Sequence, residues 1–273
     1  MEQNTNFDFQ FNFKFNLHKS LIPIGISDKD YERLIKVYGI DEKTLMREVK
    51  VIEKSNLCQA QWVKEKVDLT PFGTAVSKRI LFLGDSITSD RQSYFNILQL
   101  ACGEYTEISL VDLSISGHKS GDLFTAMFPN VHEEHADIAH IMIGTNDVRK
   151  TNDAYHAFHT GIEEYEKNID YVAAMLAEDG TKTVITTIPP FSQDKAAAYF
   201  PKHKMLFEEK DRQAFNDVIR RVGGKHGALI NDMDEVYSSY SPEDLTLMDG
   251  IHLNEVGQRL LAARVAQMLI KLF

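Results

Sequence analysis

Residues 79–88 read RILFLGDSIT, a short apolar run that ends in a Gly-Asp-Ser turn. An apolar run of this length is typical of a parallel strand that is buried on both faces. The turn leads into the next helical segment, so Ser86 is expected at the end of the strand. In open parallel sheets, ligand sites form beyond the carboxyl ends of the strands. Taken alone, Asp85 and Ser86 are equally well explained as turn and helix-capping residues.

Similar runs recur along the rest of the chain and alternate with longer segments of helical periodicity. The expected strands lie at residues 80–83, 108–113, 138–143, 183–188 and 228–230. One amphipathic helix is expected over residues 158–176, and the last begins after Asn254, a plausible N-cap. This alternation predicts an α/β fold with a mainly parallel sheet covered by helices on both faces, which is a three-layer α/β/α sandwich.

The residues that precede this pattern have a different character, and we divide the chain into an N-terminal extension (1–78) and a second domain (79–273). Phenylalanine occupies every second position from Phe7 to Phe15, which predicts a strand with one apolar face. A helix capped by Ser27, a second helix over residues 42–53 and a connector over residues 59–77 are expected to follow. The apolar strand either packs against its own chain or contacts a second subunit to form a homodimer.

Composition restricts the classes of partner. The chain has 273 residues and a formal net charge of −10, which argues against nucleic acid as a partner because nucleic-acid binding needs a basic face. Its two cysteines are expected to be reduced thiols. We find neither a signal peptide nor an apolar stretch of membrane-spanning length, so we expect a cytoplasmic protein with no membrane partner.

Three further polar blocks carry candidate catalytic residues. Residues 114–121 read SISGHKSG, and the absence of a side chain at Gly117 lets a backbone N–H approach a substrate. Residues 144–147 read GTND, where the Asn146 amide can donate to an oxyanion. Residues 249–252 read DGIH, a spacing that lets the Asp249 carboxylate orient the imidazole of His252. Each block alone is also explained by ordinary turn chemistry.

The four blocks, in this order, resemble the SGNH/GDSL hydrolase family from about residue 79 to the C-terminus. The resemblance implies a flavodoxin-like sheet and a catalytic triad in which Ser86 is the nucleophile, His252 the general base and Asp249 the third member. It also implies an oxyanion hole made by the backbone N–H groups of Ser86 and Gly117 with the side chain of Asn146. No metal or organic cofactor is implied. Many members have Asn-x-Gly where this chain has Asp-Leu-Ser at residues 112–114.

These residues predict a serine esterase that works through an acyl-enzyme, acting on a small-molecule or carbohydrate ester. Short acyl groups such as acetyl, on a carbohydrate or a similar polar alcohol, are the preferred substrates by family analogy. An acyltransferase, a lysophospholipase or a thioesterase would use the same triad. A non-catalytic binding or assembly protein is disfavoured because all the expected catalytic positions are occupied.

Two other groups of residues suggest chemistry but lack the required spacing. The pairs His132/His135 and His156/His159 do not match the His-Glu-x-x-His zinc motif, and a solvated helix end explains them equally well, so no metal is expected. Residues 223–227, GGKHG, do not form a phosphate-binding loop. They are expected to end a helix and turn before a strand.

Overall fold

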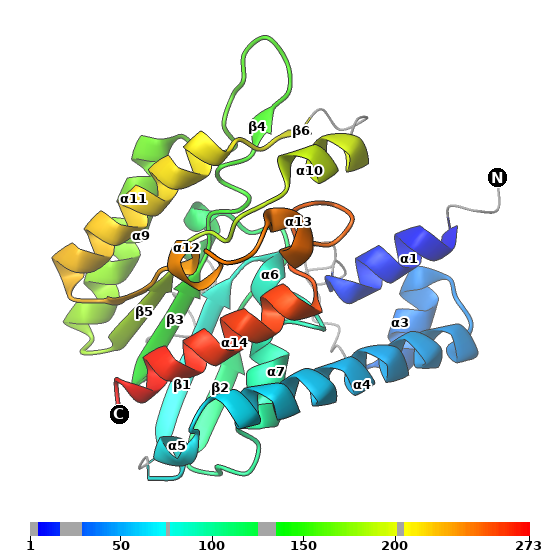
Figure 1. The fold of residues 1–273 in the computed structure, drawn as a ribbon, viewed down its shortest axis with the longest axis horizontal. Helices are drawn as coiled ribbons and strands as arrows, with labels where there is room; N and C mark the ends of the chain where they lie inside the picture. The colour runs from blue at the N-terminus through cyan, green and yellow to red at the C-terminus, as the bar shows by residue number, and fades with distance from the viewer. Residues whose placement is uncertain (1–4, 17–28, 75–76, 125–134, 201–204) are drawn as a thin grey trace.

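The computed structural model describes residues 5–16, 29–74, 77–124, 135–200 and 205–273, and its centre is a parallel five-stranded sheet (Figure 1). The strand order is β2-β1-β3-β5-β7, and all neighbouring pairs are parallel. The strands are β1 (Lys78–Gly84), β2 (Ile108–Asp112), β3 (Ile138–Met142), β5 (Lys182–Thr186) and β7 (Leu229–Asn231). Each expected strand is therefore confirmed, and the carboxyl ends of all five meet at one edge.

Helices cover both faces of this sheet, as the α/β/α prediction requires (Figure 1). One face packs against α9 (Ile162–Glu178) and α11 (Glu209–His226). The other packs against α7 (Tyr94–Ala101), α14 (Glu255–Ile270) and the C-terminal half of α4 (Glu42–Lys66). The shorter elements are α3 (Tyr31–Tyr38), α5 (Thr70–Thr74), α6 (Ser86–Ser89), η1 (Ser120–Asp122), β4 (Lys150–Thr151), α10 (Gln193–Tyr199), β6 (Met205–Leu206), α12 (Met233–Val236) and α13 (Pro242–Leu245).

The ends of the long helices follow from local capping chemistry. The Asn254 side chain accepts hydrogen bonds from the first free amides of α14, which confirms it as the N-cap. Helix α11 is capped by Gly227, whose φ of 70° is in the left-handed region that glycine adopts without strain, so the glycine-rich run does end a helix. Helix α9 begins at Ile162, later than expected. Phe158 instead lies in an isolated β-bridge with Lys150.

The prediction of a strand over the alternating phenylalanines is wrong, because Thr5–Lys14 form a helix, α1. In an α-helix successive residues are about 100° apart, so two residues separated by one position lie on nearly opposite faces of the helix. Phe9 and Phe13 therefore pack against α3 and α4. Phe11 and Phe15 point the other way, toward His252. The alternation thus serves two contact surfaces, formed by α1 and by Phe15 directly after it, and both contacts are made within the same chain.

The rest of the extension is also more helical than expected. The N-cap of α3 is Asp30, whose carboxylate accepts the Arg33 N–H, and Ser27 lies outside the described residues. Helix α4 continues to Lys66, and α5 follows it, so the predicted connector over residues 59–77 is wrong for most of its length. The longer helix is stabilised because Ala60 and Val63 pack into the core beneath the sheet. The division at residue 78 and the homodimer stay predictions.

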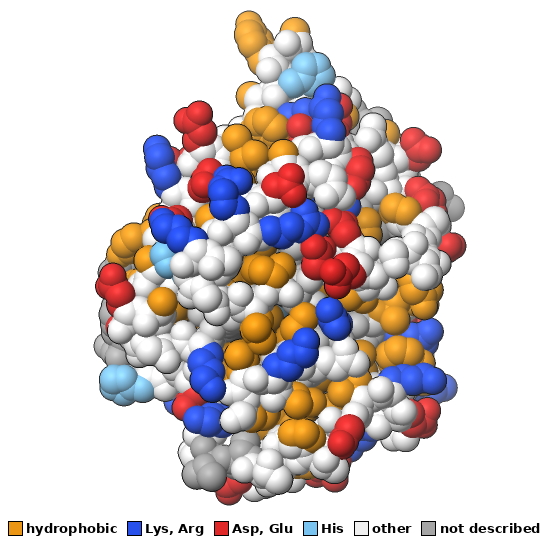
Figure 2. All heavy atoms as spheres, turned by 60° about the vertical axis from the view of Figure 1, so that its left-hand side comes forward, with side chains coloured by type: hydrophobic (Ala, Val, Ile, Leu, Met, Phe, Trp, Pro, Cys, Tyr) orange, Lys and Arg blue, Asp and Glu red, His pale blue; other side chains and the backbone are white. Residues whose placement is uncertain are grey.

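The surface and the thiols add little to the search for a site. Figure 2 shows acidic and basic side chains interspersed on one face, with apolar groups between them. Cys58 is exposed and Cys102 is buried, and both are free thiols. None of the described helices combines the length and the apolar character needed to cross a membrane.

Candidate active site

Ser86 is the first residue of α6 and stands where β1 ends. Asp85 caps this helix, and its Oδ1 accepts the Ile87 N–H at 3.0 Å. Gly84 is required at the end of the strand, because a Cβ there would lie 2.7 Å from the Met142 carbonyl oxygen of the neighbouring strand. Ser86 is 7% exposed and has the positive end of a short helix behind it. The turn therefore holds one hydroxyl at the carboxyl edge of the sheet.

A buried glutamine, Gln258 of α14, fixes the position of this turn. Its Oε1 accepts the Tyr94 N–H at 2.8 Å, and its Nε2 donates to the Ile87 carbonyl at 3.3 Å. The Thr88 and Tyr94 hydroxyls are 2.9 Å apart, which links α6 to α7 a second time. Sequence analysis missed Gln258. A polar residue in the otherwise apolar packing face of the last helix was the available signal.

Three side chains far apart in the sequence form a continuous chain of hydrogen bonds. The Ser86 hydroxyl donates to His252 Nε2 at 2.7 Å, and His252 Nδ1 donates to Asp249 Oδ2 at 2.5 Å. Asp249 is 2% exposed, and its Oδ1 accepts the backbone N–H groups of Ile251 and His252 at 2.9 and 3.0 Å. The carboxylate is thus held rigidly while its second oxygen orients the imidazole. This arrangement can transfer the serine proton to histidine.

The charges within this chain of hydrogen bonds favour a basic imidazole. Burial of His252 opposes its protonation, but the negative charge of Asp249, the hydrogen bond to it and the negative charges of Asp90 and Asp85 together outweigh burial, so the pKa of His252 is raised above its ordinary value. Burial likewise opposes ionisation of Asp249, but the charge and hydrogen bond of His252, together with the two backbone N–H groups that Asp249 accepts, outweigh it and lower the pKa of that carboxyl. Both shifts favour the imidazolium–carboxylate pair that forms when the serine is deprotonated.

The raised pKa of His252 sets the expected pH profile. Protonated His252 cannot accept the Ser86 proton, so kcat/KM for an aryl acetate is expected to rise with pH through one ionisation, with a midpoint above the ordinary histidine value of about 6.5. Asp249→Asn removes the charge that raises this pKa. The variant should therefore show a lower plateau with its midpoint displaced to lower pH. A midpoint that stays in place in Asp249→Asn would mean that the rise reports another group.

The other candidate oxyanion donors follow β2 and β3, the two strands that flank β1 in the sheet. Gly117 follows β2 with a φ of 83°, in the left-handed region where other residues are strained. Asn146 follows β3, and one N–H of its amide donates to the His118 carbonyl at 3.0 Å. The amide has a second N–H, which can donate to a substrate oxygen. Within the described chain, the backbone N–H groups of Ser86 and Gly117 have no protein acceptor.

Asp147, a second residue that sequence analysis missed, joins the two loops that carry these donors. Its carboxylate accepts the Ser120 N–H at 3.0 and 3.1 Å and the Ser120 hydroxyl at 2.6 Å. Asn168 of α9 in turn donates to that hydroxyl at 3.0 Å. Burial raises the pKa of Asp147, against its hydrogen bonds with Ser120. Since Asp147 is adjacent to Asn146, this network holds the Asn146 backbone in place.

The histidine pairs are not brought together as metal ligands in the described part of the chain, where no group of three or more suitable side chains occurs. His132 lies outside the described residues. His159 Nδ1 is 2.7 Å from a guanidinium nitrogen of Arg149, so the positive charge of Arg149 lies where a metal ion would have to bind this nitrogen. The absence of a metal from the reaction stays a prediction.

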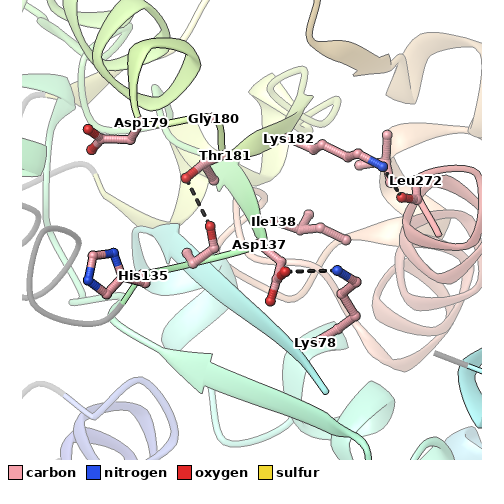
Figure 3. A pocket seen from close by; sticks show the side chains of 10 residues that line it. Lys78, His135, Asp137, Ile138, Asp179, Gly180, Thr181, Lys182 and Leu272 are labelled. Atoms are coloured by element: carbon pink, nitrogen blue, oxygen red, sulfur yellow. Dashed lines mark hydrogen bonds and ion pairs between the residues drawn. The ribbon is translucent and has the colours of Figure 1, made fainter. Parts of the chain in front are cut away.

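A cavity of about 580 Å³ lies at the opposite edge of the sheet, where the strands begin (Figure 3). Two of its charged groups are paired within the lining: Lys78 with Asp137 at 2.8 Å, and the Lys182 ammonium with the Leu272 carbonyl at 2.6 Å. The Thr181 hydroxyl donates to the carbonyl of Ala136. These contacts tie strand ends to the C-terminus and leave no reactive set of side chains, so we assign this cavity no catalytic role.

Comparison with known proteins identifies a family for most of the chain. Residues 82–260 match the model of the GDSL-like lipase/acylhydrolase family, a segment that contains all five candidate residues. The curated proteins contain no match to the chain.

Solved structures share the fold. An acetyl xylan esterase, AlAXEase, is 22% identical over 69% of this chain and 98% of its own, with a TM-score of 0.57. A lipase/acylhydrolase from Enterococcus faecalis is 19% identical over 71% and 96%, with a TM-score of 0.57. The acetylxylan esterase Axe2 from Geobacillus stearothermophilus is 19% identical over 71% and 95%, with a TM-score of 0.56.

Proposed function

The chain belongs to the GDSL-like lipase/acylhydrolase family and is a carboxylic ester hydrolase, and from this we propose that it removes short acyl groups, acetyl above all, from a carbohydrate or a similar polar alcohol. In this proposal Ser86 is the nucleophile, His252 the general base and Asp249 the residue that orients it. The observation that carries the proposal is the unbroken chain of hydrogen bonds from the Ser86 hydroxyl through His252 to Asp249.

Acylation begins when His252 Nε2 takes the Ser86 proton and Ser86 Oγ attacks the ester carbonyl. The carbonyl oxygen becomes negative and accepts hydrogen bonds from the N–H groups of Ser86, Gly117 and Asn146. As the tetrahedral intermediate collapses, the bond to the alcohol oxygen breaks. His252 then gives its proton to that oxygen, so a neutral alcohol leaves and the acyl group stays on Ser86.

Deacylation repeats the cycle with water in place of serine. His252 takes a proton from water as the water oxygen attacks the acyl carbon, and the same donors hold the second oxyanion. The bond between the acyl carbon and Ser86 Oγ breaks, and His252 returns the proton to the serine. A carboxylic acid leaves, so one ester and one water yield one acid and one alcohol.

Two observations support a short acyl group. Ser86 is 7% exposed, and the ring of Phe15 stacks on His252 with 3.9 Å between centroids. The Phe15 side chain therefore already fills space beside the triad. Acetyl xylan esterases also occur among the proteins of similar fold. A small acyl group needs little room beyond the oxyanion donors, whereas a long chain would need an apolar channel.

A panel of esters tests the substrate class. We expect kcat/KM to be largest for p-nitrophenyl acetate and to fall as the acyl chain lengthens to butyrate and octanoate, by about tenfold or more for each methylene that does not fit. Acetylated xylo-oligosaccharides should release acetate. The Ser86→Ala protein serves as the blank for each ester. Equal rates on octanoate and acetate would contradict the short-acyl proposal, and acyl transfer to an added alcohol in preference to water would indicate an acyltransferase.

A further inference from the structure

The end of α1 is attached directly to the loop that follows the nucleophile helix. The Arg91 backbone N–H donates to the Lys14 carbonyl at 2.9 Å, and the Arg91 Nε–H donates to the Phe13 carbonyl at 2.9 Å. The Asn16 amide donates to the Ser89 carbonyl at 2.7 Å. All three bonds join the N-terminal extension to residues within five positions of Ser86. The extension is thus built onto the catalytic turn, although it lies outside the segment that matches the family.

The attachment of α1 also includes an ion pair with a buried carboxylate. Asp90 is fully buried, and the Lys14 ammonium lies 3.0 Å from its carboxylate. If α1 moved away, that carboxylate would lose this cation, and an unpaired buried charge is strongly unfavourable. The energetics therefore favour α1 as a permanent part of the site over a cover that opens in each turnover.

Docked in this way, α1 brings aromatic rings to the catalytic histidine. Phe15 stacks on the imidazole of His252, with ring planes 29° apart, and is 1% exposed. Phe11 lies edge-on to both rings, 4.8 Å from Phe15 and 6.0 Å from His252 between centroids. Tyr199, at the end of α10, stacks with Phe11 at 6.2 Å. Phe15 is thus the buried member, whereas Phe11 and Tyr199 are half-buried.

The position of these rings indicates that they contact the alcohol part of the substrate. His252 must give its proton to the alcohol oxygen that leaves, so that oxygen has to lie within hydrogen-bond reach of Nε2. The alcohol portion then extends beside the imidazole, where Phe11 lies with Tyr199 stacked against it. Partly exposed aromatic rings bind flat, amphipathic groups well, and the C–H face of a sugar ring is such a group.

We propose that Phe11 and Tyr199, braced by Phe15, form the subsite for the alcohol part of the ester, so that the N-terminal extension determines substrate specificity. This inference rests on the proposed function and adds the residues that recognise the leaving group. Phe15 acts as a positioning residue, because it contacts the imidazole and supports Phe11.

Two acetate esters that differ only in their alcohol test the subsite. Phe11→Ala should lower kcat/KM for an acetylated xylo-oligosaccharide about three- to tenfold, the value of one aromatic contact, mainly by raising KM. For ethyl acetate, whose alcohol is too small to reach the rings, the change should be less than about twofold on the same scale. Phe11→Tyr keeps the ring and should restore activity on the sugar ester. Tyr199→Ala, on a different element, should repeat the selective loss.

The matched control is Phe9→Ala, on the opposite face of α1, where the ring packs against Phe13 and Tyr38. This variant should change the two esters equally, and circular dichroism should show that each variant keeps its helices. A loss of the same size on both esters in Phe11→Ala and Tyr199→Ala, or no loss on either, would overturn the subsite.

A binding measurement separates this proposal from the proposed function. Calorimetry with the deacetylated xylo-oligosaccharide and the Ser86→Ala protein should detect binding, and Phe11→Ala in that background should weaken it about three- to tenfold. If the wild-type protein hydrolyses neither the acetylated xylo-oligosaccharide nor ethyl acetate, the proposed function alone is rejected. Absence of oligosaccharide binding, or binding that Phe11→Ala leaves unchanged, would overturn the subsite alone.

Discussion

Ser86→Ala is expected to abolish ester hydrolysis, with a fall in kcat of about 10⁴-fold or more, because the attacking oxygen is lost while its surroundings stay intact. His252→Ala should be about as damaging, and the double variant no worse than either single variant, since residues that act as a unit have non-additive effects. Turnover of p-nitrophenyl acetate by purified protein, with the melting temperature recorded alongside, measures both effects.

Ser89→Ala is the matched control for this prediction. Ser89 lies in the same short helix and is buried, and its hydroxyl has no hydrogen-bond partner in the described part of the chain. Removal of that hydroxyl should leave turnover within about twofold of the wild type, since no bond is broken. Wild-type turnover in Ser86→Ala, or an equal loss in both variants, would reject Ser86 as the nucleophile.

The second large effect is expected at Asn146. Asn146→Ala should lower kcat by roughly 10²–10³-fold, the cost of removing one oxyanion donor, with a smaller change in KM because the donor acts mainly in the transition state. Steady-state kinetics on the acetate ester separates the two constants. Because the amide also bonds the His118 carbonyl, the melting temperature must be compared as well. A rise in KM with unchanged kcat would assign Asn146 to binding or to the turn.

The sheet and the site could be predicted because their signals are local. Each strand is a short apolar run, and each candidate catalytic residue stands directly after one or directly before the last helix. Parallel strands place their carboxyl ends at one edge, so residues from separate blocks of the sequence converge there. The Asp249–His252 pair meets Ser86 because the loop before α14 returns to that edge, with Gln258 holding the helix against α6.

The N-terminal extension could not be predicted in the same way, because its conformation depends on tertiary contacts. Alternating phenylalanines satisfy the pattern of a strand, but the same spacing gives a helix two apolar faces when two partners are present. The partners here, Leu34 and Leu45 on one side and His252 on the other, are distant in sequence. The expected connector over residues 59–77 contains Pro71 and Gly73, two residues typical of loops, but Pro71 is near the start of α5, where proline is tolerated in a helix.

Covalent labelling with a serine-directed phosphonate, followed by intact-mass and peptide analysis, is the most direct measurement of the catalytic role of Ser86. Wild-type protein is expected to gain one phosphonyl group, located on Ser86, with loss of activity in proportion to labelling. Ser86→Ala should gain none, and His252→Ala should be labelled far more slowly, because no base activates the hydroxyl. Active protein that resists the phosphonate, or that carries the label on another residue, would contradict the triad.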